Sequence, residues 1–374
     1  MFRHLIFLRH IPVLLIAMVL ALQATHAFAI SYQVTDLGII SGELSSEAYG
    51  INDNGAVTGS SGSEPFLWTA QTGIRDLGIP SGYWSASGVA INNNGKIAVR
   101  ADKMISNFYY GHAFRWSSNG YQDMGTLGGT FSTCYGIDDA GQIAGYAYTT
   151  AGDIHAYRST TGTSLVDIDS LGGNYSLGYG INAGGQVVGQ AYNSAHQYHA
   201  FLWNGSGSMQ DLGTLGGTQS QANNISDSGI IVGDSSTAND SSYHAFILQN
   251  GVKKDLGSLT SYSSYGVAVN NAGQVIGVYY DGKYDHPYLW DSVNGMRNIN
   301  GLLDPVSGAG WTIGAVNDIN NLGQIVGQGQ HNGNSRAFLL TPIPEPDSII
   351  ILICGAIAFL CYARFHAYFQ KNSG

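Results

Sequence analysis

The sequence is poor in cysteine and in charge. Of its three cysteines, Cys354 and Cys361 lie in an apolar run near the C-terminus, so Cys134 is alone in the body of the chain. This excludes a disulfide framework, and we expect Cys134 to be a small buried residue rather than a nucleophile. Only 11% of the 374 residues are charged and the formal net charge is −10. That balance argues against a nucleic-acid partner, because proteins of that class need a basic face.

Glycine and tyrosine are abundant instead, with 52 and 23 residues. Glycine adopts positive φ without steric cost, so this composition favours many short strands joined by tight turns. Hydrophobic residues make up 44% of the chain, a fraction too high for a disordered protein.

The N-terminus has the features of a secretory signal peptide, residues 1–29. Arg3 and Arg9 precede an apolar segment, and Ala27 and Ala29 form an A-x-A cleavage site. We therefore predict that the protein is exported and that cleavage follows Ala29. An uncleaved N-terminal anchor is the alternative.

The C-terminus predicts a transmembrane anchor. Residues 348–363 are uncharged and largely apolar, and residues 364–374 form a short basic tail that begins at Arg364. The apolar run is shorter than the about 20 residues of a usual spanning helix. Arg364 can extend it by placing its charge at the membrane interface. Positive charge after the run puts the tail on the cytoplasmic side.

A Pro-Glu-Pro motif precedes this anchor, at Pro344, Glu345 and Pro346 within a Pro-rich linker of residues 342–347. With the apolar segment and Arg364, the motif resembles the PEP-CTERM sorting signal of Gram-negative bacteria. The resemblance implies an exported protein of such a bacterium, membrane-anchored or at the cell surface, with an exosortase-type sorting enzyme as a partner. The single arginine departs from the family's usual arginine cluster.

The body of the chain is a sequence repeat. A segment similar to Gly-Ile-Asn-x-x-Gly-x-Val-x-Gly recurs seven times, and its turn glycines are Gly55, Gly95, Gly141, Gly185, Gly229, Gly273 and Gly323. The period of about 44 residues is typical of propeller blades and is too long for leucine-rich or hexapeptide coils.

Two further signatures recur between these glycines. His-Ala-Phe or a variant begins at His112, His155, His199, His244 and His286, and Asp-Leu-Gly or a variant begins at Asp36, Asp76, Asp123, Asp211 and Asp255. Each unit therefore contains four short apolar runs, which are too rich in glycine, β-branched and aromatic residues for helices. We predict one four-stranded antiparallel blade per unit. Its Asn-x-x-Gly turn should be a tight hairpin in which asparagine tolerates the left-handed region and glycine takes positive φ.

The two ends of the body complete each other. Residues 32–38 have the sequence of a fourth strand with no unit before it, and residues 336–340 form a third strand with no fourth strand after it. We predict an all-β, seven-bladed β-propeller over residues 30–341, in which the N-terminal strand closes the last blade and removes exposed edges. An open β-solenoid is the alternative.

The units also resemble the HAF repeats of bacterial extracellular proteins. The resemblance rests on the His-Ala-Phe sequences at His112, His199 and His244, and it spans most of residues 32–340. It implies export and a repeat fold, and it supplies no activity.

The repeated histidines and aspartates are interpreted as structural residues that stabilise the fold. Neighbouring blades are too far apart for several of these histidines to coordinate one ion at about 2 Å. Each ring is expected to hydrogen-bond a neighbouring strand or the repeated aspartate. We expect no bound metal and no cofactor.

No catalytic motif or pair of carboxylates stands out, so we assign no catalytic residues and interpret the protein as a non-enzymatic binding or structural module. An extracellular hydrolase or lyase acting on polysaccharide, with an asymmetric acidic pocket near the ring axis, is the alternative.

The variable loops between the second and third strands are rich in tyrosine, which suits glycan or surface-protein ligands. The candidate binding residues are Tyr109, Tyr110, Tyr148, Tyr192, Tyr198, Tyr243, Tyr280 and Tyr284. These rings could instead pack the blade margins.

Overall fold

The computed structural model describes residues 31–105 and 108–344. The chain divides into two compact units, one of which, Gln33–Thr341, contains nearly all of the described residues. The predicted signal peptide with Ala27 and Ala29, and the predicted anchor and tail with Arg364, lie outside the described residues, as do Glu345 and Pro346. Within the described ranges, no helix is long and apolar enough to cross a membrane.

The described chain is built almost entirely of strands, which follow the sequence repeat. Each repeat is named below by its first strand. The first three repeats are β2 (Ser46–Ile51), β3 (Val57–Ser61), β4 (Glu64–Thr69) and β5 (Gly73–Asp76); β6 (Ser85–Ile91), β7 (Ile97–Ile105), β8 (Phe108–Ser117) and β9 (Gly120–Asp123); and β10 (Gly128–Ile137), β11 (Ile143–Thr149), β12 (Ile154–Ser159) and β13 (Leu165–Asp169).

The next three repeats are β14 (Gly172–Ile181), β15 (Val187–Asn193), β16 (Tyr198–Trp203) and β17 (Gln210–Asp211); β18 (Gly216–Ile225), β19 (Ile231–Thr237), β20 (Tyr243–Gln249) and β21 (Val252–Gly257); and β22 (Ser264–Val269), β23 (Val275–Tyr280), β24 (Asp285–Asp291) and β25 (Gly295–Asn298). The last repeat is β26 (Trp311–Ile319), β27 (Ile325–His331) and β28 (Asn334–Ile343), joined by β1 (Ser31–Asp36). Two short 3-10 turns, Ala238–Asp240 and Ile299–Leu302, interrupt the strands.

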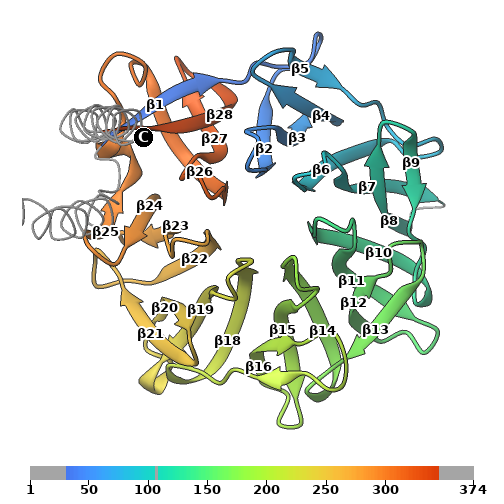
Figure 1. Ribbon diagram of the computed structural model, residues 1–374. Coiled ribbons are helices and arrows are strands. Elements are labelled where there is room, and N and C mark those ends of the chain that lie inside the picture. The colour runs from blue at the N-terminus through green and yellow to red at the C-terminus, as the bar shows by residue number, and fades with distance from the viewer. Residues whose placement is uncertain (1–30, 106–107, 345–374) are drawn as a thin grey trace, which may run out of the picture. The chain divides into compact units, whose positions relative to one another are not determined.

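Each repeat folds as an antiparallel sheet in which neighbours in sequence are neighbours in the sheet. The described strands form five four-stranded sheets and one eight-stranded sheet, in which the β10 and β14 repeats are joined by a parallel pairing of β12 with β14 at Ile154 and Tyr175. Figure 1 shows the sheets of the Gln33–Thr341 unit side by side in a circle, with the first strand of each repeat nearest the centre.

The aromatic residue of the His-Ala-Phe motif forms the core between neighbouring sheets. In the β14 repeat, Phe201 is fully buried and packs with Trp203, which is two residues further along and on the same face of β16. The other repeats bury the equivalent residue, at Phe66, Phe114, Tyr157, Phe246, Tyr288 and Phe338. This spacing explains why the motif recurs: the third position of each unit must fill the seam between sheets.

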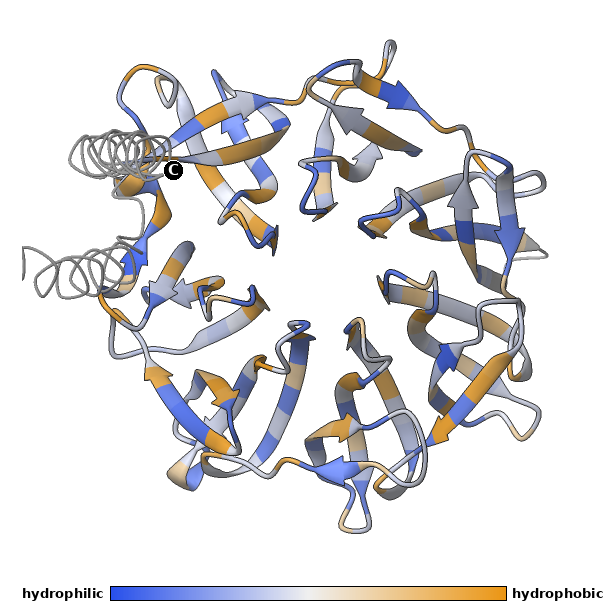
Figure 2. Ribbon diagram, viewed as in Figure 1, coloured by the Kyte–Doolittle hydropathy of each residue, from blue (hydrophilic) through white to orange (hydrophobic). Residues whose placement is uncertain are grey.

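The Asn-x-x-Gly turn joins neighbouring repeats as well as reversing the chain. Asn52 Oδ1 accepts from the backbone N–H groups of Asn54 and Ala56, and its Nδ2 donates to Asn92 O of the next repeat over 2.9 Å. Gly55 takes the predicted positive φ, at +75°. The expectation that the turn asparagine takes a left-handed conformation was wrong. Asn52 keeps a negative φ while its side chain bridges to the next repeat. These turns form the hydrophilic tips near the centre of Figure 2.

The predicted closing strand is confirmed. β1 pairs with β28 at the edge of the β26 repeat, and Leu37 N donates to Ala337 O over 3.0 Å. Leu37 is buried in one cluster with Phe66 and Trp68 of the β2 repeat and Leu339 of β28. The first and last repeats therefore share an apolar seam like those between consecutive repeats, which contradicts an open solenoid.

Candidate functional site

The repeated histidines do pair with the repeated aspartates. His112 Nδ1 lies 2.9 Å from Asp123 Oδ2, and the same pair forms between the third and fourth strands of three later repeats, as His155–Asp167, His199–Asp211 and His244–Asp255. Burial acts to raise the pKa of Asp123, but hydrogen bonds from His112 and from Gly125 N outweigh it, so the pKa is lowered. Each pair links the edge strand to its neighbour in the sheet, which is the structural role expected for these residues.

Three repeats depart from this pattern. The β2 repeat has Glu64 in place of the histidine. His286 turns its Nε2 to Asp281, at 2.8 Å, because Asn298 stands opposite its strand where the other repeats have aspartate. Hydrogen bonds from His286 and from the backbone N–H groups of Tyr284 and Lys283 lower the pKa of Asp281 to about 2. In the last repeat, His331 of β27 takes the histidine's place and lies 3.0 Å from Asp36 of β1.

A repeated serine, not predicted from the sequence, clasps neighbouring repeats together. Ala200 N donates to Ser220 Oγ over 2.9 Å, and Ser220 Oγ donates to Gly213 O over 2.7 Å. The same two bonds form at Ser46, Ser132, Ser176 and Ser264. A serine at this spacing is visible in the sequence, but its role depends on contacts between strands about 20 residues apart.

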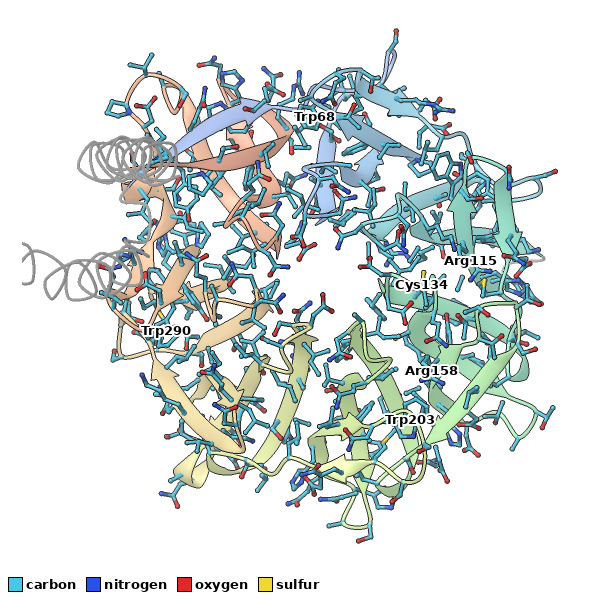
Figure 3. All side chains as sticks on the ribbon, viewed as in Figure 1. Trp68, Arg115, Cys134, Arg158, Trp203 and Trp290 are labelled. Carbon is cyan, nitrogen blue, oxygen red and sulfur yellow. The ribbon has the colours of Figure 1, made fainter. Side chains whose placement is uncertain are left out.

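Other chemistry-bearing groups of the body are also structural. Cys134 is fully buried on β10, which confirms the interpretation of a small core residue, and burial raises the pKa of its thiol to about 12. Arg158 stacks over the Trp203 ring of the next repeat at 4.8 Å (Figure 3). Over the described ranges, no group of three or more His, Cys, Asp and Glu side chains could hold a metal ion.

A cavity of about 450 Å³ is lined mainly by the first strands of the repeats. Seven equivalent positions, each two residues before the end of its first strand, contribute to its wall: Tyr49, Val89, Tyr135, Tyr179, Asn223, Val267 and Asn317. We call this the axial cavity. Unlike the histidine, serine and asparagine contacts, its wall differs from repeat to repeat, and it is thus an asymmetric site built on a near-symmetric frame.

Tyrosines and one cation form one side of the axial cavity. Tyr135 and Tyr179 meet edge to face with ring centroids 5.4 Å apart. Arg100 of β7 lines the same cavity and has its Nε 3.9 Å from Asp102 Oδ2, close enough for an ion pair but too far for a hydrogen bond. Tyr49 donates its hydroxyl to Glu47 Oε2 over 3.1 Å.

Asn223 and Asn317 supply amides on the other side, where Asp318 also lines the cavity and Asp234 is bonded to Asn223. Asp234 Oδ1 accepts from Gln221 Nε2 and Asn223 Nδ2, at 3.1 and 3.0 Å, while burial raises the pKa of Asp234 to about 6. Burial likewise raises the pKa of Asp318 to about 6, although its carboxylate accepts from Ile51 N and Ile319 N. Asp318 thus accepts with both carboxylate oxygens, whereas Asp234 accepts with Oδ1 alone.

The eight tyrosines selected from the sequence lie near strand ends in several repeats and do not form one site. Tyr192 and Tyr198 stack with centroids 4.2 Å apart, Tyr280 meets Tyr262 at 5.6 Å, and Tyr243 lies 6.2 Å from Tyr265. Tyr110 and Tyr148 lie near the tips of the β7–β8 and β11–β12 hairpins, and Tyr284, 57% exposed, carries Lys283 over its ring at 4.6 Å. The side chain of Tyr109 is outside the described structure.

Sequence reasoning did not select the axial wall. Tyr135 and Tyr179 immediately precede the Gly-Ile signature, and the signal available was variation: the residue at this position changes between repeats, while the isoleucine or valine two residues later is kept in all seven. A residue type that varies within a strict repeat is not required by the fold, so such a position is available to bind a ligand.

Comparison with known proteins identifies the fold of the chain but does not assign it to a family. No family model and no curated protein matches the sequence. A streptogramin B lyase structure matches with a TM-score of 0.51 at 11% identity, covering 83% of this chain and 99% of that one. A putative TolB from Agrobacterium tumefaciens gives 0.48 at 14% identity over 84% and 100%, and a virginiamycin B lyase from Staphylococcus aureus gives 0.47 at 12% over 83% and 100%. The body is an all-β propeller of four-stranded antiparallel sheets.

Proposed function

We propose that the protein is a non-enzymatic binding module, a seven-bladed propeller whose ligand occupies the axial cavity. The eight-stranded sheet counts as two blades, because its halves are separate sequence repeats joined by a single parallel pairing. The asymmetry of the axial wall carries the proposal, since a wall that served only the fold would repeat like the His–Asp pairs. At about 450 Å³ the cavity lies in the range of small-molecule sites.

A neutral, hydroxyl-rich ligand such as a glycan fits this wall best. Tyrosines present flat apolar rings with hydrogen-bonding tips, and Asn223 and Asn317 add amides opposite them. Arg100 has a counter-ion in Asp102 at 3.9 Å, and both carboxylate oxygens of Asp318 accept backbone hydrogen bonds, which disfavours a charged ligand. The bonds to Asp318 also disfavour the alternative of a polysaccharide hydrolase or lyase, which needs a free acid and base.

The binding experiment uses Tyr49, which lines the cavity. Tyr49→Ala is expected to weaken binding of the best ligand from a glycan panel by about tenfold, the loss of about 1.4 kcal/mol. Tyr262→Ala, an exposed tyrosine away from the cavity, is the matched control. Equal binding by both variants would remove the cavity as the site. Release of shortened sugars from the panel would instead establish the enzyme alternative.

The proposal includes export and membrane attachment through the terminal segments. Cleavage after Ala29 and retention by residues 348–363 would place the propeller at the outer surface of the cell. N-terminal sequencing of the membrane fraction should begin at Ile30, and removal of residues 343–374 should release the body. Retention of that shortened chain in the membrane fraction would contradict the anchor.

A further inference from the structure

We propose that the axial site binds a sugar chain rather than a single sugar, along a line of aromatic rings that leads from the cavity to the hairpin tips. This proposal rests on the proposed function and specifies its ligand. The line, called the aromatic track, consists of three equivalent pairs from the β10 and β14 repeats. From the cavity outward these are Tyr135 and Tyr179, Phe131 and Tyr175, and Tyr148 and Tyr192.

The strand geometry places these rings along one direction. Phe131 and Tyr135 are four residues apart on β10, about 13 Å along the strand, and both rings lie against Tyr146 of β11. On β11, Tyr146 is paired with Thr133, which lies between them, and Tyr148, two residues further along, shares the face of Tyr146. The track thus extends well beyond the length of the inner pair.

Ring contacts make the track continuous. Tyr135 lies 5.4 Å from Tyr179 and 6.2 Å from Tyr146, which in turn stacks on Phe131 at 5.8 Å. Phe131 lies 5.5 Å from Tyr148. Burial, together with nearby tyrosines that include Tyr135 and Tyr148, raises the pKa of Tyr175 of the β14 repeat.

On the β14 side, Tyr175 lies 5.4 Å from Tyr192, which stacks on Tyr198. The outer end is open to solvent, since Tyr148 is 36% exposed and Tyr192 is partly exposed.

Packing of the fold does not require these rings, as the other repeats show. At the four positions where the β10 repeat has Phe131, Tyr135, Tyr146 and Tyr148, two other repeats have polar or acidic side chains. These are Gln219, Asn223, Asp234 and Ser236 in the β18 repeat, and Thr312, Asn317, Gln328 and Gln330 in the β26 repeat. The frame tolerates any of these sets, so the four aromatic residues of the β10 repeat, three of which recur in the β14 repeat beside Gln190, have another role.

The occupant follows from this chemistry. A sugar chain alternates apolar ring faces with hydroxyls, and tyrosine offers an apolar face with a polar tip. An extended peptide would need free strand edges for its backbone, whereas the track presents side chains. A single sugar would use the inner pair alone and leave the outer rings without a ligand.

The test measures affinity against chain length by calorimetry. The probes are hexasaccharides, trisaccharides and monosaccharides of the cello-, malto-, laminari- and chito- series, with the full-length protein in a detergent that has no sugar headgroup. We expect one series in which the hexasaccharide binds at least tenfold tighter than the monosaccharide. Tyr148→Ala and Tyr192→Ala should each lower hexasaccharide affinity by about fivefold and leave monosaccharide affinity unchanged, while Tyr135→Ala lowers both.

Tyr262→Ala is again the matched control, and thermal melts confirm that each variant folds. If affinity does not rise with length, or the outer variants match the control, the chain proposal is overturned while a binding site at the axis stands. If Tyr49→Ala and Tyr135→Ala also match the control, the proposal that a ligand binds in the axial cavity is overturned as well. Binding of an unstructured peptide library in place of every sugar would identify a different occupant and overturn the glycan chain.

Discussion

The seams between repeats and the wall of the axial cavity follow opposite rules. At the seams the same residues recur, so that Ser220 has counterparts in four other repeats and Phe201 in every one. At the axis equivalent positions hold tyrosine, valine or asparagine. The difference separates fold from function within one chain, because the repeated positions carry what every blade needs and the varied positions carry what only one site needs. Substitutions at the seams should therefore change stability, and those at the axis should change binding.

The largest effect is expected from removing the closing strand. Deletion of residues 31–38 removes the β1–β28 pairing and the packing of Leu37, and it should lower the melting temperature by at least about 10 °C or cause aggregation. Deletion of residues 345–374, outside the described body, is the control. A melting temperature within a few degrees of the intact protein would mean that the seam between first and last repeats is not equivalent to the others.

A smaller loss is expected at the serine clasp. Ser220→Ala removes both bonds of a buried hydroxyl and leaves Ala200 N without its acceptor, at a cost of about 1–3 kcal/mol in the free energy of unfolding. Urea denaturation measures it, with exposed Ser118→Ala as the control. Ligand affinity should not change. A clasp variant as stable as its control would show that the recurrence of serine has another cause.

At the axis, Asp234→Asn is expected to stabilise the protein at neutral pH. Burial raises the pKa of Asp234 to about 6, above its unfolded value, so its favourable contribution is present at low pH and is lost as pH rises through about 6. An asparagine Oδ1 can keep both amide bonds without the buried charge. The gain, on the order of 2 kcal/mol at pH 7.5, should disappear near pH 4. Melting curves at the two pH values that differ from wild type equally would contradict this account.

The smallest effect is expected at the partly exposed His–Asp pairs. His199→Ala should cost less than about 1 kcal/mol, because Asp211 is 42% exposed and remains solvated. Phe201→Ala, two residues away in the same motif, should cost about 3–5 kcal/mol. Denaturation of the two variants side by side tests whether the histidine clips an edge or holds the core; equal losses would favour the second role.

The repeated features could be predicted from the sequence, and the functional importance of the varied positions could not. Strands, buried Cys134, the His–Asp pairs and the closing strand could be predicted because each is local or recurs in register. Asp167 was missed because its neighbours do not form Asp-Leu-Gly. Tyr135 and Tyr179 were missed because loops were expected to carry the ligand, and only the strand register shows that strand residues line the axis.

The closing strand also fixes the order of events when the chain is made. β1 leaves the ribosome before any other described strand, and its partner β28 leaves last. Asp36 of β1 can pair with His331 of β27 only after the chain has grown by a further 295 residues. Until then the chain has an unpaired first strand and an open seam, and contacts of such sequence separation form slowly. The ring therefore cannot be completed before β28 has been made. A chaperone or a membrane channel that handles the growing chain meets every blade before it meets a closed propeller.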